Sequence, residues 1–159
     1  MDDALQDRVP AGFLRRTAAY TIDVVPIVLI TFGYFYVFRT GFAEALSDVA
    51  SNWSDLDARV RFLEMRNQVR DLSFFLWLIF TTLSESSEWQ ATIGKRVCGI
   101  KVIGPDGERI SFLRALARSL AKILSYLPLA LGFLWALFSK DKRTWHDKLT
   151  DTAVVMSNV

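Results

Sequence analysis

An acidic residue and a proline interrupt an otherwise apolar stretch, residues 18–30, with the sequence AAYTIDVVPIVLI. A carboxylate inside an apolar span costs about 2.5–3.5 kcal/mol on insertion scales, so we expect Asp23 to face protein or water rather than lipid. Pro26 carries no backbone N–H, which frees the carbonyl of Ile22 beside Asp23. A carboxylate next to a free carbonyl can bind a proton or a monovalent cation. Asp23 is therefore the first candidate for an ion- or proton-coupling residue.

A structural role for Asp23 is the alternative. Arg114, Arg118 and Lys122 recur every four residues and therefore share one helical face. Asp23 would pair with Arg114 or Arg118, and this buried pair would fix how two helices pack. The same basic stripe could instead line a cytoplasmic vestibule or contact anionic lipid headgroups. Both roles for Asp23 stay open, and they are compatible with each other.

Two further acidic residues, Glu85 and Glu88, lie one helical turn apart at the end of a second apolar segment. They are the remaining candidates for ion or proton coupling. Lys95 or Arg96 would be their partners in a charge network. The alternative is a solvated helix end, where the two carboxylates simply face water.

The sequence argues against an enzyme. One His and one Cys exclude a disulfide framework and a Cys/His zinc site. The segment IGKR is not a phosphate loop, because Trp89 stands where the first Gly is needed and Arg96 replaces Ser or Thr. No nucleophile motif accompanies His146 and Asp147, so we assign His146 to an interface and Asp147 to a loop anchor that pairs with Arg15 or Arg16. We expect no catalysis, no cofactor, no metal and, with a net charge of only +2, no nucleic-acid partner.

The apolar segments predict a mainly α, multi-span helical membrane protein. The chain is 52% hydrophobic. Residues 17–38 would span about 33 Å, enough for the hydrocarbon core of a bilayer, and form the first transmembrane helix. Residues 71–88 form the second. Between them lies a polar extracytoplasmic insert, 39–70, in which 56–72 has the apolar spacing of an amphipathic helix.

The second half of the chain changes character. Residues 94–112 contain β-branched residues and a Pro-Asp-Gly turn, which predict a cytoplasmic β-hairpin with strands at about 96–103 and 108–112. The C-terminal run 150–157 predicts a strand that joins this hairpin, since a lone hairpin is marginally stable. Residues 112–138 predict membrane helices 3 and 4. The whole chain, 1–159, would be a single domain.

The distribution of basic residues predicts the topology. Fourteen of the 19 Lys and Arg residues lie in 1–16, 86–122 and 139–159. The positive-inside rule places both termini and the hairpin in the cytoplasm, and the insert outside. Segment 112–138 must then enter the membrane and return, turning near Pro128 and Gly132, or else cross once and leave the C-terminus outside. We expect a multi-pass protein of the bacterial inner membrane.

Three stretches of the sequence resemble the RDD family of small integral membrane proteins: GFLRRTAAYTIDVV, SEWQATIGKRVCGIKVIGPDGERISFLRALARSL and KRTWHDKLTDTAVV. The family is named for an arginine and two aspartates. On this chain they correspond to Arg15 or Arg16, Asp23, and Asp147. His146 departs from the family pattern, in which Gly is common before the second aspartate. The resemblance implies a membrane location, and for some members of the family it implies monovalent cation/proton exchange.

Two functions follow from these observations. The first is transport of monovalent cations or protons with Asp23 as the coupling carboxylate, in a homo-oligomer, because so few helices enclose little volume. The second is a membrane adaptor that binds a membrane or cytoplasmic protein through its β-unit or its outer helix. For Arg15 and Arg16 the expected role is to set the topology and contact lipid phosphates.

Overall fold

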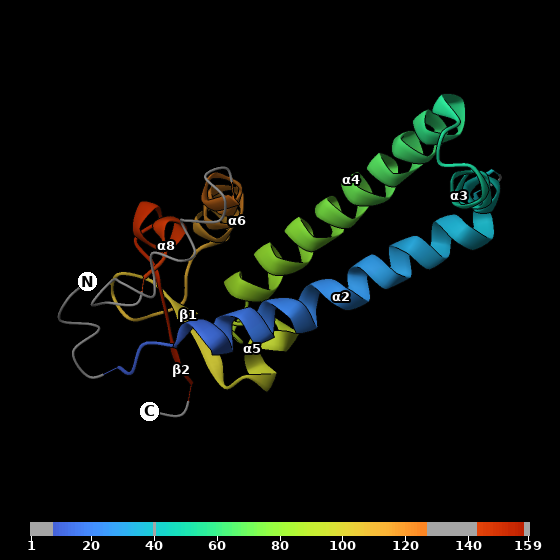
Figure 1. Ribbon diagram of the computed structural model, residues 1–159. Helices are drawn as coiled ribbons and strands as arrows, with labels where there is room; N and C mark the ends of the chain where they lie inside the picture. Colours follow the sequence, from blue (N-terminus) through green and yellow to red (C-terminus); the bar gives the residue numbers. More distant parts are fainter. Residues whose placement is uncertain (1–7, 40, 127–142, 158–159) are drawn as a thin grey trace. The chain divides into compact units, whose positions relative to one another are not determined.

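The computed structural model describes residues 8–39, 41–126 and 143–157 (Figure 1). The described chain is mainly helical, with one small antiparallel sheet. It divides into two compact units, one built from residues 1–23 and 78–159 and the other from 24–77. The elements in chain order are α2 (Phe13–Phe38), α3 (Phe42–Ser51), α4 (Leu56–Ser86), α5 (Ile93–Val97), β1 (Ile100–Ile103), α6 (Phe112–Tyr126), α8 (Trp145–Leu149) and β2 (Ala153–Met156).

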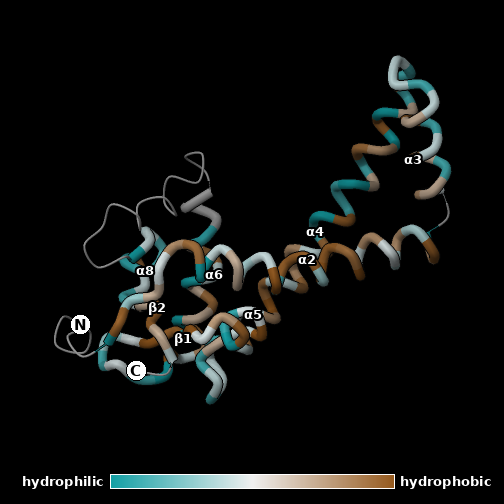
Figure 2. The backbone as a smooth tube through the Cα atoms, turned by 60° about the horizontal axis from the view of Figure 1, so that its bottom comes forward, coloured by the Kyte–Doolittle hydropathy of each residue, from teal (hydrophilic) through white to brown (hydrophobic). Residues whose placement is uncertain are grey.

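Helix α2 contains the first predicted span. It has 26 residues, and only 17% of its most apolar stretch is buried. Among the described residues it is the one helix long and apolar enough to cross a membrane. Pro26 lies inside the helix without ending it. Figure 2 shows that hydrophobic residues predominate along α2. A long apolar helix of which so little is buried needs another apolar environment.

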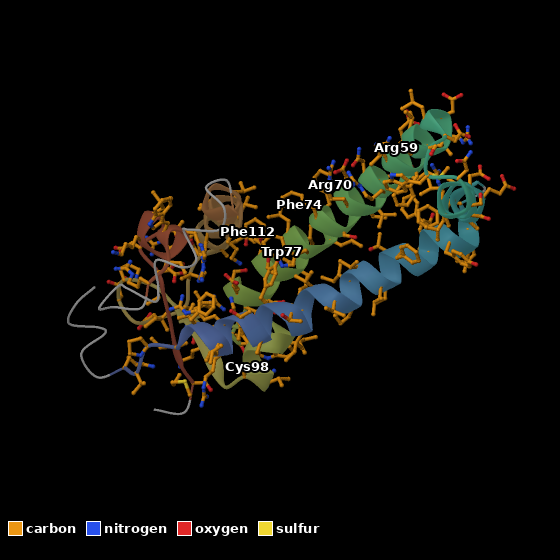
Figure 3. The ribbon with its side chains drawn as sticks, in the orientation of Figure 1. Arg59, Arg70, Phe74, Trp77, Cys98 and Phe112 are labelled. Carbon is orange, nitrogen blue, oxygen red and sulfur yellow. The ribbon has the colours of Figure 1, made fainter. Side chains whose placement is uncertain are left out.

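Helix α4 joins two segments that the sequence analysis treated separately. The amphipathic segment 56–72 and the predicted second span 71–88 form one continuous helix of 31 residues. Charged side chains such as Arg59 and Arg70 occupy its first part, and Phe74 and Trp77 follow (Figure 3). Helix α4 is long enough to span a membrane, but because its apolar part is short it is not apolar enough to count as a candidate span. The second span therefore stays a prediction.

The predicted β-hairpin is wrong. Strand β1 pairs antiparallel with β2, which puts Lys101 opposite Val155, whereas residues 108–112 form no strand. The Pro-Asp-Gly segment does turn the chain, and the N–H of Gly104 donates to the carbonyl of Glu108 at 2.8 Å. That loop leads directly into α6 instead of a second strand. The C-terminal strand, expected as a third member, is in fact the partner of β1.

The other edges of this sheet are also occupied. Residues 9–11 run along β2, where the N–H of Ala11 donates to Val154 and the N–H of Met156 donates to Val9, both at 2.9 Å. On the outer side of β1 the N–H of Val102 donates to the carbonyl of Gln90 at 2.8 Å. The small sheet is thus stabilised by neighbouring backbone on both sides, which compensates for its having two strands.

A compact apolar core packs the sheet against the start of α2 and α6. Its buried members are Ala11, Ala19, Ile100, Val102, Ile110, Ala115 and Val154. The second unit has a smaller cluster of Phe35, Phe42 and Val69, with Met65 packed against it. Helix α6 begins after Ser111, whose hydroxyl accepts the N–H of Arg114 at 3.3 Å. The predicted turn at Pro128 and Gly132 lies outside the described residues.

The β1–β2 pairing predicts a specific disulfide. With Cys98→Ala, the pair Lys101→Cys/Val155→Cys will oxidise readily, because these residues face each other across the sheet. The pair Lys101→Cys/Arg109→Cys, which tests the hairpin instead, will not. Gel mobility with and without reductant measures both. Efficient cross-linking of the second pair and not the first would contradict the observed register.

Candidate functional site

Ionisable side chains from five helices meet in the interior of the first unit. Each of them is buried or nearly so, and we refer to them together as the buried charge cluster. Its members are Arg16 from α2, Glu85 from α4, Lys95 from α5, Arg118 and Lys122 from α6, and His146 and Asp147 from α8. Charges at such depth are costly unless each is paired, so the five helices are bound to one another by these contacts.

Glu85 is the first centre of the cluster. Its side chain is fully buried and contacts three cations. Oε1 accepts from the ammonium of Lys95 and, at 3.3 Å, from that of Lys122, while Oε2 lies 3.7 Å from Nε of Arg118. One carboxylate therefore neutralises charge brought by two different helices, α5 and α6.

Asp147 is the second centre. Its Oδ2 accepts from Nη1 of Arg16 at 2.5 Å, and its Oδ1 lies 2.7 Å from Nη2 of Arg118. Burial alone would raise the pKa of Asp147, but Arg118 and Arg16 outweigh it and hold that pKa well below its usual value. Asp147 also accepts the N–H of Thr144 at 3.2 Å, which completes a capping box at the start of α8.

Arg118 connects the two centres. It contacts both Glu85 and Asp147 and is only 2% exposed. Within the described residues, four basic side chains therefore surround two carboxylates. This excess of positive charge makes a proton easier to remove from whichever cation still reaches water.

Lys95 is the more exposed of the two lysines of the cluster. Its side chain keeps 13% of its surface exposed, against 9% for Lys122. Burial lowers the pKa of Lys95 to about 8, although Glu85 opposes the shift. A lysine with a pKa this close to neutrality exchanges its proton with solvent in the physiological range.

His146 is buried and neutral at pH 7. Burial lowers its pKa to about 3, with the carboxylate of Asp147 opposing the shift. Its Nε2 lies 3.0 Å from the hydroxyl of Thr144 and 3.6 Å from Oδ1 of Asp147. An interfacial position was expected for His146 from the sequence, whereas the structure buries it inside the cluster, where its neutral ring adds no charge.

Asp23 has partners other than the arginines considered for it. Its Oδ2 accepts the hydroxyl proton of Thr92 at 2.5 Å, and its Oδ1 accepts the N–H of Gly94 at 2.8 Å. Thr92 is the N-cap of α5, and its hydroxyl also accepts the N–H of Lys95. Asp23 therefore holds the start of α5 against α2. Arg118, one of its two expected partners, contacts Glu85 and Asp147 instead.

The remaining candidates lie outside the cluster. Glu88 is exposed and lines a shallow hollow with Trp89. Arg15 is exposed, and its Nη1 lies 3.4 Å from the carbonyl of Cys98. Arg114 is half-buried beside Gly104. Of the two arginines that could match the family's arginine, it is Arg16 that reaches Asp147.

Two threonines of the site were not singled out from the sequence. Thr92 and Thr144 each begin a short helix, and each is followed three residues later by a charged residue of the cluster, Lys95 and Asp147. A threonine three residues before an acid is the spacing of a capping box, so the second of these signals was present in the sequence.

Comparison with known proteins decides the family. The model of the RDD family matches residues 10–151. The chain belongs to the RDD family. It is 26% identical to the uncharacterized protein YxaI of Bacillus subtilis over 147 residues, which is 92% of this chain and 97% of YxaI. It is 37% identical to the uncharacterized protein YckC of the same organism over 67 residues, 39% of this chain and 44% of YckC. No solved structure matches.

Family membership and the apolar helix α2 together fit a membrane protein. The family's arginine and two aspartates correspond to Arg16, Asp23 and Asp147 on this chain, and these residues lie in two separate sites. Arg16 and Asp147 form an ion pair, whereas Asp23 fixes α5. Both sites join the beginning of α2 to segments much later in the chain.

Replacing Gly94 by Ala will destabilise the protein by about 1–3 kcal/mol. A Cβ at Gly94 would lie 2.2 Å from the carbonyl oxygen of Ala19 and 3.0 Å from Cγ of Asp23, so α5 must move away from α2. Thermal unfolding in detergent measures the loss. Gly33→Ala is the matched control, because nothing lies within 4 Å of its added Cβ. Equal melting temperatures for the two variants would contradict the close contact.

His146 will make the protein sensitive to acid. The pKa of His146 is about 3 in the folded protein and near 6.5 when unfolded, so between these values the unfolded state binds more protons. The contribution of His146 to the free energy of unfolding is therefore fully present above pH 6.5. Below that pH the free energy of unfolding falls by about 1 kcal/mol per pH unit. Denaturant unfolding of wild type and His146→Gln at pH 7, 6, 5 and 4.5 measures this. Parallel pH profiles for the two proteins would show that His146 does not titrate on unfolding.

Proposed function

We propose that this chain is a multi-span membrane protein that exchanges protons for monovalent cations, with Glu85 and Lys95 as its coupling pair. The observation that carries the proposal is a fully buried carboxylate held by a lysine whose pKa is about 8. Family membership and the uncovered apolar helix α2 support the membrane location. Asp23, the coupling residue expected from the sequence, is better suited to a structural role, because both of its oxygens are already hydrogen-bonded.

The coupling would arise from competition for one oxygen. When Lys95 is protonated, its ammonium occupies Oε1 of Glu85. When Lys95 loses its proton to solvent, the cluster loses one positive charge, and a monovalent cation can take the place of the ammonium at Glu85. Proton release and cation binding are then two sides of a single exchange.

The proposed topology follows the distribution of basic residues. Both termini and the β1–β2 sheet would lie in the cytoplasm, and the insert 39–70 would lie outside the bacterial inner membrane. This places Lys95 near the cytoplasmic end of the spans. Because the described helices enclose little volume of their own, the pathway through the membrane would form between copies of the chain in a homo-oligomer.

The adaptor function has less support. An adaptor using the β-unit would most simply add a partner strand to a free sheet edge. Residues 9–11 already lie along β2, and Gln90 bonds to β1 at Val102. The sheet therefore offers little free backbone to a partner.

The decisive variant is Lys95→Arg. Arginine keeps the positive charge beside Glu85 but does not lose its proton at physiological pH, so folding is retained and exchange is lost. Proteoliposomes loaded with a pH dye and given Na⁺, K⁺ or Li⁺ gradients will show wild-type exchange that rises with a midpoint near pH 8. Lys95→Arg will show at least a tenfold lower rate.

Lys101→Arg, a matched change on β1 away from the cluster, will exchange like wild type. Wild-type rates for Lys95→Arg would overturn the coupling pair. If folded wild-type protein shows no flux for any of the three cations, transport itself is overturned and the adaptor function is favoured.

A further inference from the structure

An exposed apolar surface runs from the end of α4 through α5. Leu83, Trp89, Ile93 and Val97 are 55%, 59%, 56% and 70% exposed. Ile93 and Val97 are four residues apart, so they share one face of α5. We refer to these four residues as the α4–α5 apolar surface. Four large apolar side chains gathered within fifteen residues mark a place where the protein meets another apolar phase.

The contacts of α5 fix its level along α2. Gly94 donates its N–H to Asp23 and lies against the carbonyl of Ala19. Along α2, Ala19 and Asp23 are about 6 and 12 Å beyond Arg15, at 1.5 Å per residue. The headgroup layer of a bilayer is about 5–7 Å thick on each side. If the exposed Arg15 lies at the water-facing edge of that layer, α5 lies at the boundary between headgroups and acyl chains.

Two cations next to this surface are suited to phosphate. The guanidinium of Arg96 stacks over the ring of Trp89, 4.3 Å from its centroid, and remains exposed. Nη1 of Arg15 lies 3.4 Å from the carbonyl oxygen of Cys98, the C-cap residue of α5. Neither arginine forms an ion pair with a carboxylate of the described residues. A tryptophan at the membrane interface beside a free arginine is a typical anchor to a lipid headgroup.

We propose that the α4–α5 apolar surface inserts into the cytoplasmic leaflet and that Arg96 and Arg15 bind the phosphate of an anionic phospholipid. This inference rests on the membrane location in the proposed function but not on transport. It also replaces the headgroup contact considered for the basic stripe of α6, because Arg118 and Lys122 are buried among carboxylates and do not face lipid.

A hollow beside Trp89 gives the headgroup room. It has a volume of about 360 Å³ and is lined by Leu83, Ser84, Ser87, Glu88 and Trp89. The serine hydroxyls and the carboxylate of Glu88 suit a headgroup that carries hydroxyl groups, whereas Glu88 repels a second anionic group. Phosphatidylglycerol combines one phosphate with a glycerol headgroup, which makes it the probe of choice.

Spin labels in lipid nanodiscs test the insertion. In a Cys98→Ala background, a label at Val97→Cys will be more accessible to oxygen than to a water-soluble nickel reagent. Leu29→Cys on α2, 64% exposed, reports whether the helix itself is in lipid, and Asp106→Cys in an exposed turn reports water. If the label at Val97 is more accessible to the nickel reagent while the label at Leu29 is more accessible to oxygen, this inference alone is overturned. If the label at Leu29 is also more accessible to the nickel reagent, the membrane location is overturned with it.

The headgroup contact has its own test. Replacing phosphatidylcholine by phosphatidylglycerol in the nanodiscs will raise the melting temperature of wild type, and Arg96→Gln will lose at least half of that shift. Arg109→Gln, also exposed but away from α5, will keep it. Arg96→Gln will still exchange protons in liposomes, which separates the lipid contact from the coupling pair. A full phosphatidylglycerol shift in Arg96→Gln would overturn the headgroup site.

Discussion

The contact on which the first unit depends is that of Arg118 with two carboxylates from different helices, Glu85 and Asp147. A charge buried this deeply is tolerated only when its partners are in place, and removing one partner of such a pair typically costs about 3–5 kcal/mol. Glu85 therefore requires α4 beside α6, and Asp147 requires α8 beside α6. Arg16 then attaches the beginning of α2, and Lys95 attaches α5. The guanidinium of Arg118 thus holds together the two carboxylates that Arg16 and Lys95 contact.

In the buried charge cluster and its surroundings, the residue that positions α5 differs from the residue that we propose takes up and releases the proton. Asp23 is satisfied by the hydroxyl of Thr92 and the backbone N–H of Gly94, so it positions α5 without remaining available to an ion. Lys95, on the same short helix, is placed between Glu85 and water. The acid in the apolar stretch of α2 therefore serves the proposed coupling indirectly: it holds the helix that carries the titrating lysine. The exposed face of that helix is the one that we propose inserts into lipid.

The sequence predicts those parts of the molecule that depend on local pattern. The apolar length of residues 17–38, the strand at 150–157 and the start of a helix after Ser111 all have local signals, and each lies in or at a corresponding element. The prediction of a hairpin was wrong because turn residues show that the chain reverses its direction, but they do not show which strand will pair with β1. Val154 and Val155, more than fifty residues away, provide that partner.

The site was only partly predictable for the same reason. Helical spacing put Arg118 and Lys122 on one face, but the sequence carries no signal that this face turns inward. Nor could spacing choose Arg16 over Arg15, or reveal that a backbone N–H would satisfy Asp23. The most direct test of the account is the pKa of Lys95, measured by NMR of ¹⁵N-labelled lysine ammonium groups in nanodiscs and assigned with Lys95→Arg. We expect a pKa of about 8. A value near the ordinary 10.5 would contradict it.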